Sequence, residues 1–333
     1  MNVVNDMTKR IRILALAIAS VFVLGSCLEH SKRDDDNHTP TGLVLGGGGA
    51  KAAAEIGALQ ELERQGVQVD YIVGTSMGAV IGVLYAAGYD ADEIWTMWQE
   101  EEWLKLFEKE SMWQVTGNRS IFGVMNGDVF EQKLNRALAD KECHTFDDLE
   151  IPFVCIATEI VDEITLAERR LDSGSLARAV RASMTYPAPL VGYQPVYFDG
   201  KRLVDGGMMN NLPVNAADSM GAQAIIAVDL ETETSDWGVL KKLANKMLRM
   251  SGKLNLVQDI TDTGWLLQWL TSTVDSDKRS FNRNKDNFPG LIYVHPELHN
   301  FTVLSFGAED AKTMRLRGQD AMRKQERMLN ALE

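Results

Sequence analysis

The sequence predicts an α/β fold, and three observations lead to this prediction. The chain has 333 residues, of which 45% are hydrophobic and 24% charged, so it can bury a sizeable core in one large domain or two smaller ones. An apolar stretch at residues 43–45 is followed by four glycines and a helical pattern over residues 50–65. A second apolar stretch, residues 69–73, is followed by a glycine-containing turn and a helical pattern over residues 79–88. Strands that alternate with helices are typical of α/β domains.

Charge and cysteine content exclude several classes of protein. The chain carries 34 Lys and Arg residues against 47 Asp and Glu residues, a formal net charge of −13. This balance supplies no net positive charge for phosphates, so we expect no nucleic-acid partner. Three cysteines are too few for a disulfide framework, and Cys155, in an apolar run, is expected to be a buried small side chain. Because no His, Cys and Asp cluster has the spacing of metal ligands, we expect no metal and no other cofactor.

The first 26 residues have the features of a targeting segment. A basic start with Lys9, Arg10 and Arg12 precedes an apolar run of about a dozen residues, which is short of the roughly 20 that span a bilayer. The run has the proportions of a secretory signal. It ends in Leu-Gly-Ser-Cys, which resembles the lipobox of a bacterial lipoprotein and implies cleavage before Cys27 and acylation of its thiol. An uncleaved anchor or a plain signal peptide with a chance cysteine is the alternative.

Residues 27–41 are polar and contain three consecutive aspartates, so they are expected to form a solvated tether behind the acylated Cys27. Two or more acyl chains would anchor the protein stably in a membrane. Leu28 stands where an inner-membrane retention signal has Asp, and resemblance to the enteric sorting rule favours the outer membrane. We therefore expect a lipid-anchored protein of the bacterial cell envelope.

Four consecutive glycines stand at residues 46–49, between the first predicted strand and its helix. Each costs folding entropy of about 0.5–1 kcal/mol relative to Ala, so the run indicates a backbone that needs positive φ or the close approach of a ligand. The free N–H groups of such a loop, at a helix N-terminus, form a ready site for an anion.

Three kinds of site use a glycine loop of this type. A nucleotide-binding Walker A loop fails here because alanines flank Lys51. A dinucleotide-binding loop fits Gly47, Gly49 and Ala52, with Asp70 near the expected distance, although Asp70 lies at the start of the next strand rather than at its end. The third kind is an oxyanion hole, in which the glycine amides stabilise the charge of a tetrahedral intermediate.

The second strand leads into Gly-Thr-Ser-Met-Gly at residues 74–78, which is the G-x-S-x-G pattern of a nucleophile elbow between a strand and a helix. Gly74 and Gly78 leave room for the tight turn around Ser76. The hydroxyl of Ser76 would then be exposed at the positive end of the following helix. The sequence therefore predicts Ser76 as a nucleophile.

A nucleophilic serine needs a base, and the chain offers two sources. His295 and His299 flank a predicted strand at residues 291–294, but no motif surrounds either histidine. Asp205 follows a predicted hairpin and precedes two glycines, so a tight turn could present its carboxylate directly to the serine hydroxyl. A plain Asp-Gly turn is the alternative for Asp205.

The three motifs, in this order along the chain, resemble those of the patatin-like phospholipases over about residues 42–230. The matching positions are Gly47, Gly48, Gly49, Ala50 and Lys51 in the glycine loop, Gly74, Thr75, Ser76, Met77 and Gly78 in the elbow, and Asp205, Gly206 and Gly207 at the acid. The resemblance implies a three-layer α/β/α sandwich with a mostly parallel central sheet. It also implies a serine acyl hydrolase that cleaves the fatty-acyl esters of membrane lipids.

The resemblance implies a role for each of these residues. Ser76 attacks the acyl ester, Asp205 activates Ser76 without a histidine, and water then releases the fatty acid. The amides of Gly47, Gly48 and Gly49 form the oxyanion hole. The supporting positions are Lys51, Gly74, Gly78 and Gly206.

The loop departs from the family at Ala52, where the family usually has glycine after the basic residue. A methyl group that crowds the turn would disturb the oxyanion hole, in which the loss of one donor costs about 10²–10³ in rate. The alternative function is therefore a catalytically weak lipid-binding or scaffold lipoprotein of the same fold.

Residues 231–333 predict a helical excursion to about residue 290, a returning strand at residues 291–294 and a C-terminal helix from residue 308. Aromatic side chains cluster at helical spacing in residues 94–107 and 265–269, and this spacing favours packing in the core over a membrane-facing lid. The sequence makes no prediction of the oligomeric state.

Overall fold

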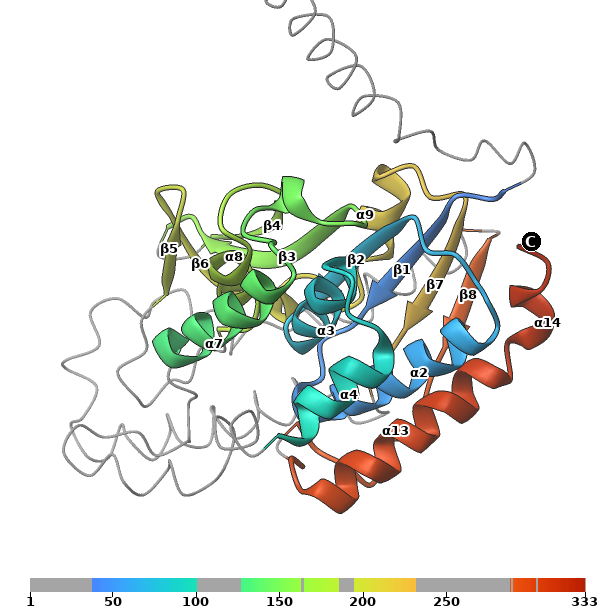
Figure 1. Cartoon of the computed structure of the whole chain (residues 1–333). Helices are drawn as coiled ribbons and strands as arrows, with labels where there is room; N and C mark the ends of the chain where they lie inside the picture. Colours follow the sequence, from blue (N-terminus) through green and yellow to red (C-terminus); the bar gives the residue numbers. More distant parts are fainter. Residues whose placement is uncertain are drawn as a thin grey trace, which may run out of the picture. The chain divides into compact units, whose positions relative to one another are not determined.

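A mixed β-sheet forms the centre of the fold (Figure 1). The computed structural model of the protein describes residues 38–100, 127–162, 165–185, 195–231, 288, 290–303 and 305–332. The sheet lies within one unit that runs from Thr39 to Glu333. Its described strands are β1 (Thr41–Leu45), β2 (Tyr71–Thr75), β3 (Phe153–Ile160), β4 (Leu166–Leu171), β5 (Val196–Phe198), β6 (Lys201–Asp205), β7 (Ala224–Val228) and β8 (Leu291–Val294).

Parallel pairing dominates the middle of the sheet. Strand β1 pairs in parallel with β2 on one side and with β7 on the other, and the parallel ladder continues to β3 and β8 at its two ends. The antiparallel pairs lie beyond β3, which pairs with β4 and with β6, while β5 and β6 form a hairpin. The predicted α/β fold with a mostly parallel sheet is confirmed.

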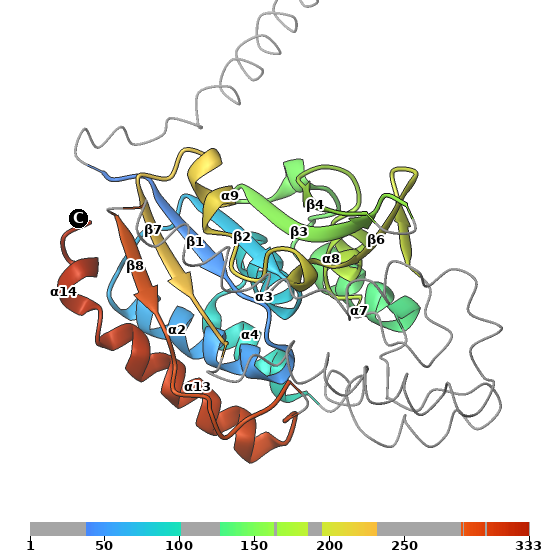
Figure 2. The same cartoon turned by 180° about the vertical axis from the view of Figure 1, so that it is seen from behind.

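Helices cover both faces of this sheet. The described helices are η1 (Gly49–Ala52), α2 (Ala53–Arg64), α3 (Met77–Ala86), α4 (Ala91–Gln99), α7 (Gly127–Asp140), η2 (Phe146–Asp148), α8 (Leu176–Ser183), η3 (Gly206–Met208), α9 (Val214–Ser219), α13 (Ala308–Arg323) and α14 (Glu326–Leu329). Helix α9 packs on one face, and α2, α3, α4 and α13 lie on the other (Figures 1 and 2). Leu43 and Leu45 belong to the larger core and Val44 to the core under α9, so β1 is buried on both faces as parallel strands usually are.

The helices begin close to the positions that the sequence predicts. The helix predicted over residues 50–65 opens with the 3₁₀ turn η1, after which α2 runs to Arg64. Helix α3 begins at Met77, directly after Ser76, which is two residues earlier than predicted. Strand β8 occupies residues 291–294, and α13 covers most of the predicted C-terminal helix.

Several sequence-based expectations fall on residues that the structure does not describe. The targeting segment with Cys27, the tether as far as residue 37, and residues 101–126 and 232–287 lie outside the described residues. Of the first aromatic cluster, Ile94, Trp95 and Trp98 are described. Ile94 and Trp98 are buried in the core as predicted, and Trp95 is half-buried against it. Within the described ranges, every helix falls short of the length and apolar character that a membrane span requires.

Helices α2 and α13 pack with their backbones in direct contact. A Cβ atom added at Gly57 of α2 would lie 1.8 Å from the carbonyl oxygen of Arg315, and one added at Gly318 of α13 would lie 1.8 Å from that of Ala54. Glycine at both positions therefore lets the two helices approach more closely than other residues allow. Because α2 begins at the glycine loop, this contact ties the C-terminal helix to that loop.

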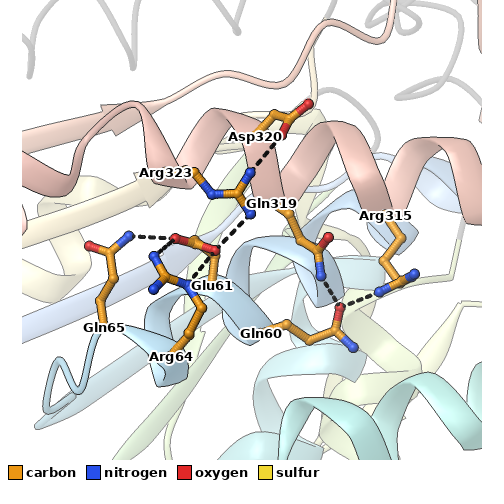
Figure 3. A network of polar contacts seen from close by, with 8 residues as sticks. All are labelled: Gln60, Glu61, Arg64, Gln65, Arg315, Gln319, Asp320 and Arg323. Carbon is orange, nitrogen blue, oxygen red and sulfur yellow. Dashed lines mark hydrogen bonds and ion pairs between the residues drawn. The ribbon is translucent and has the colours of Figure 1, made fainter.

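A network of polar contacts also joins α2 and α13 (Figure 3). The nearly buried Glu61 accepts hydrogen bonds from Arg64 at 2.5 Å and from Arg323 of α13 at 3.1 Å. These bonds, that from Arg64 above all, lower the pKa of Glu61 to about 2. The other residues of the network are Gln60, Gln65, Arg315, Gln319 and Asp320.

Substitution of Gly318 by alanine tests the close helix contact. Alanine favours an isolated helix by up to about 1 kcal/mol relative to glycine. At this position we expect the reverse, a loss of about 1–3 kcal/mol in the free energy of unfolding, because the new methyl group meets a backbone carbonyl. Urea unfolding followed by circular dichroism measures the change, with Lys312→Ala on the exposed side of α13 as the control. A Gly318→Ala variant more stable than the parent would contradict the packing.

Candidate active site

Ser76 occupies a strained turn between β2 and α3. Its φ of 55° and ψ of −125° lie outside the regions that non-glycine residues commonly adopt. A Cβ atom at Gly74 would lie 2.5 Å from the Cα of Ala79, and one at Gly78 would lie 2.4 Å from the carbonyl oxygen of Leu45. The turn thus requires glycine two residues before and after Ser76, which is the geometry of a nucleophile elbow.

The backbone of Ser76 is held from a distant part of the chain. Its N–H donates to Ser183 Oγ at 2.9 Å, and the hydroxyl of Ser183 donates in turn to the carbonyl oxygen of Ile156 at 2.5 Å. Ser183 is fully buried at the end of α8. The sequence predicts no role for Ser183, because nothing in the residues around it indicates which backbone group its hydroxyl contacts.

The topology of β3 brings Asp205 to Ser76. Strand β2 runs parallel to β3 and ends at Thr75, which pairs with Ile156. Strand β6 runs in the opposite direction and ends at Asp205, which pairs with Ala157, the next residue of β3. Ser76 Oγ donates a hydrogen bond to Asp205 Oδ2 at 2.7 Å, although the two residues are 129 positions apart.

The carboxyl group of Asp205 is buried and only 3% exposed. Its Oδ1 accepts a second hydrogen bond from the N–H of Gly207 at 2.8 Å. Burial raises the pKa of Asp205 to about 7, and the bonds from Ser76 and Gly207 oppose this rise only in part. A Cβ atom at Gly206 would lie 2.2 Å from the carbonyl oxygen of Ile156, so the turn after the acid needs glycine. The result is a carboxyl group that can take up a proton near neutral pH while it contacts a serine hydroxyl.

The two candidate histidines have other surroundings. His295 Nδ1 lies 3.1 Å from the backbone oxygen of Asp229 and 3.4 Å from the hydroxyl of Tyr293. His299 is exposed in the turn after β8. Among the contacts of the described residues, neither histidine reaches Ser76, whereas Asp205 does.

The glycine loop lies beside Ser76, and two of its amides donate to no acceptor among the described residues. A Cβ atom at Gly47 would come within 3.1 Å of the Cβ of Ser76. The N–H of Gly47 donates to the carbonyl oxygen of Asn211 at 3.2 Å. The N–H groups of Gly48 and Gly49 donate to none of the described backbone or side-chain groups. Gly49 has a φ of 56°, and a Cβ atom there would lie 2.4 Å from the carbonyl oxygen of Val303.

Lys51 and Ala52 follow the loop in the turn that leads into α2. The side chain of Lys51 is buried, and its Nζ donates to the carbonyl oxygen of Leu230 at 2.7 Å. This bond fastens the loop to the segment after β7. Ala52 has a φ of −60° and a ψ of −16°, which are ordinary helical values, so its methyl group brings no backbone strain.

The position of Asp70 bears on a dinucleotide site, and the arrangement of the His, Cys, Asp and Glu side chains bears on a metal site. Asp70 lies at the start of β2, where its Oδ2 accepts a hydrogen bond from the N–H of Thr41 at 2.7 Å. The glycine loop follows the other end of the parallel strand β1, so Asp70 is too far along the sheet to bind the ribose of a dinucleotide held by that loop. In the part of the chain that the structure describes, no group of three or more His, Cys, Asp and Glu side chains is arranged to hold a metal ion.

A sequence profile described as patatin-like phospholipase matches residues 43–218, more than half of the chain. The chain belongs to the patatin-like phospholipase family. It is 39% identical over 203 residues to patatin-like phospholipase domain-containing protein 6 of Mus musculus, which covers 59% of this chain and 14% of that protein.

Other relatives match a larger share of this patatin-like chain. It is 27% identical over 282 residues to lysophospholipase NTE1 of Kluyveromyces lactis, which covers 80% of this chain and 18% of that protein. The chain thus spans less than a fifth of the length of either curated relative. Among solved structures, VipD from Legionella pneumophila aligns with a TM-score of 0.46 and 18% identity over 89% of this chain and 67% of that one.

The burial of the Asp205 carboxyl predicts a pH-dependent effect on the stability of this patatin-like domain. Its pKa is about 7 in the folded state against 3.8 ordinarily, so folding favours its protonated form. The stabilisation is complete below about pH 4 and is lost as the pH rises through 7. Asp205→Asn cannot ionise, so we expect it to exceed the parent in free energy of unfolding by up to about 3–4 kcal/mol near pH 8, and by little near pH 4.

Urea unfolding at the two pH values measures the difference. Asp218→Asn, at an exposed position on α9, serves as the control and should leave the stability nearly unchanged at both pH values. An Asp205→Asn variant that shows the same stability difference at both pH values would contradict the raised pKa.

Proposed function

We propose that the protein is a serine acyl hydrolase of the phospholipase A type, which cleaves the fatty-acyl esters of membrane lipids. The 2.7 Å hydrogen bond from Ser76 Oγ to the buried carboxyl of Asp205 carries the proposal. A serine hydroxyl at a strained elbow, with a base in contact and free amides nearby, suits nucleophilic attack on a carbonyl carbon. The relative from Kluyveromyces lactis is named a lysophospholipase, which supports a lipid ester as the substrate class.

The reaction has two stages. Asp205 accepts the proton of Ser76 as the serine oxygen attacks the ester carbonyl, and it returns the proton to the alcohol oxygen when the ester bond breaks. This leaves the fatty acyl group on Ser76. Asp205 then takes a proton from water, whose oxygen attacks the acyl carbonyl, and the fatty acid leaves as the proton returns to the serine oxygen. A base with a pKa near 7 suits both proton transfers at neutral pH.

The oxyanion that forms in each stage needs donors close to Ser76. We assign this role to the N–H groups of Gly48 and Gly49, which no described residue engages. The N–H of Gly47 is bound to Asn211, so this assignment is narrower than the three amides expected from the sequence. Two oriented amides would stabilise the developing charge without a metal ion in the mechanism.

The alternative of a catalytically weak scaffold depended on crowding by Ala52. The helical backbone at Ala52 removes that reason, because its conformation is one that alanine adopts freely. The side chain of Ala52 points into the core, where it is fully buried. These observations favour the hydrolase over the scaffold.

We further propose that the protein is a bacterial lipoprotein, anchored through an acylated Cys27 after removal of residues 1–26, and that it lies in the outer membrane. The support is the basic start, the short apolar run and the Leu-Gly-Ser-Cys sequence. Such an anchor would hold a lipid hydrolase close to its substrate. The residues from Cys27 to Pro40 would then span the distance between the anchor and the folded part, which begins with β1 at Thr41.

Loss of either dyad residue should abolish hydrolysis. We expect Ser76→Ala and Asp205→Asn each to reduce the rate on phospholipid and lysophospholipid vesicles by at least about 10³-fold, with the fold retained. Intact mass after exposure to a fluorophosphonate should show one adduct on the parent and none on Ser76→Ala. The control is Asp218→Asn, which should keep the parent rate. A fully active Asp205→Asn variant would exclude the dyad and return attention to His295 and His299.

Replacement of the acylated cysteine should release the protein from the membrane. We expect Cys27→Ser to move it into the soluble fraction or to leave its signal peptide uncleaved, because the proposed anchor is attached through the thiol of Cys27. Fractionation and immunoblotting measure both effects. Cys143→Ser, at a buried free cysteine of the folded part, is the matched control and should fractionate as the parent does. Unchanged fractionation of Cys27→Ser would rule out the lipobox.

A further inference from the structure

Asn211 makes two hydrogen bonds to a single residue of the glycine loop. Its side-chain Nδ2 donates to the carbonyl oxygen of Gly47 at 3.0 Å, and its backbone carbonyl oxygen accepts from the N–H of Gly47 at 3.2 Å. The side chain is 4% exposed, so it is shielded from competition by water. A Cβ atom at Gly47 would lie 2.4 Å from Asn211 Oδ1, which shows how closely the amide packs against the loop.

The bond to the Gly47 carbonyl has a consequence for the next residue. The carbonyl group of Gly47 and the N–H of Gly48 belong to one peptide group, which is planar and trans. In such a group the C=O and N–H bonds point in opposite directions. By fixing the Gly47 oxygen, Asn211 therefore also fixes the direction in which the Gly48 N–H points.

The second free amide is oriented without a distant side chain. The carbonyl oxygen of Gly48 accepts from the N–H of Lys51 at 3.1 Å, within the turn that opens η1. The same planarity then sets the direction of the Gly49 N–H. Gly48 N–H depends on Asn211, whereas Gly49 N–H depends on the local turn.

Asn211 also belongs to the segment that carries the acid. It stands six positions after Asp205, beyond the turn η3 and before α9. One short segment thus holds the base against Ser76 and holds the loop beside it. The neighbouring Asn210 is also buried, but its side chain donates to Glu168 and Asn215 at 2.9 Å each, whereas that of Asn211 donates to the loop.

We propose that Asn211 is a positioning residue of the oxyanion hole, which aims the N–H of Gly48 at the substrate oxygen through the Gly47–Gly48 peptide group. The inference rests on the proposed function, because it concerns the hydrolysis of an ester at Ser76. A purely structural asparagine would affect stability and leave the stabilisation of the oxyanion unchanged. The two roles differ in what happens when the substrate oxygen is replaced.

The test compares an acyl ester with the matching thionoester, in which sulfur replaces the carbonyl oxygen. Sulfur is larger and a weaker hydrogen-bond acceptor than oxygen, so an oxyanion hole assists the thionoester much less. The ratio of kcat/KM for the two substrates therefore measures how well the hole is formed. The ratio also contains the difference in intrinsic reactivity between the ester and the thionoester. This difference is the same for every variant, so it cancels when variants are compared.

Two variants remove the donor in different ways. Asn211→Ala deletes the side chain, and Asn211→Leu keeps nearly its shape, so that packing is preserved in the second if the first fails to fold. We expect kcat for the ester to fall by about 10–10²-fold in both, with KM within about twofold of the parent, since the contact acts in the transition state. The ratio of ester to thionoester should fall by a similar factor.

Asn210→Ala is the matched control, because it removes a buried amide of the same segment that donates to Glu168 and Asn215. It should keep the parent ratio even if it lowers the midpoint of thermal unfolding. An unchanged ratio in folded Asn211→Leu, with an active parent, would overturn the inference and leave the proposed function intact. A parent that hydrolyses neither substrate would overturn both.

Discussion

The site depends on a carboxyl group buried beside a serine hydroxyl. In water, a carboxylate is too weak a base to assist a serine at neutral pH, and burial changes this by raising the pKa of Asp205 to about 7. The mixed sheet places Asp205 beside Ser76, because β2 and β6 run in opposite directions and end at neighbouring residues of β3. An all-parallel sheet would place both strand ends side by side at one edge. The antiparallel hairpin is therefore what brings the carboxyl group of Asp205 to the hydroxyl of Ser76.

At several glycines of the site, backbone atoms of a neighbouring element occupy the space that a side chain would need. Around Ser76 they admit α3 and the end of β1, and after Asp205 Gly206 admits the backbone of β3. In the loop, the same absence of a side chain leaves amides open beside the serine. Each of these residues weakens the fold in isolation, since glycine loses more entropy on folding than other residues. The surrounding contacts hold them in conformations that the chain alone would not favour.

Local motifs in the sequence were enough to predict the strands and helices around the glycine loop and the elbow, and to single out Ser76 and Asp205, which the structure brings into contact. The elbow and the glycine loop each lie within a few residues, where periodicity and glycine spacing can be read directly. The contact of Ser183 with Ser76 spans 107 positions, and no pattern in the sequence pairs a serine hydroxyl with a particular backbone amide. The same holds for Asn211, whose side chain contacts the loop across a separation of 164 positions. Lys51 lies within the predicted glycine loop motif, but the partner of its side chain could not be predicted either. Its Nζ donates to the carbonyl oxygen of Leu230.

The contact between the glycine loop and Val303 has a consequence for how this fold is inherited. The family profile ends at residue 218, yet the Val303 carbonyl accepts the N–H of Ala50 at 2.9 Å and leaves no space for a side chain at Gly49. Helix α13, which follows, then locks onto α2 through paired glycines. The family profile is thus shorter than the region that shapes the loop. A fragment cut at the end of the profile would therefore lose contacts that hold the glycine loop, so the folded unit includes β8 and α13 as well as the motifs.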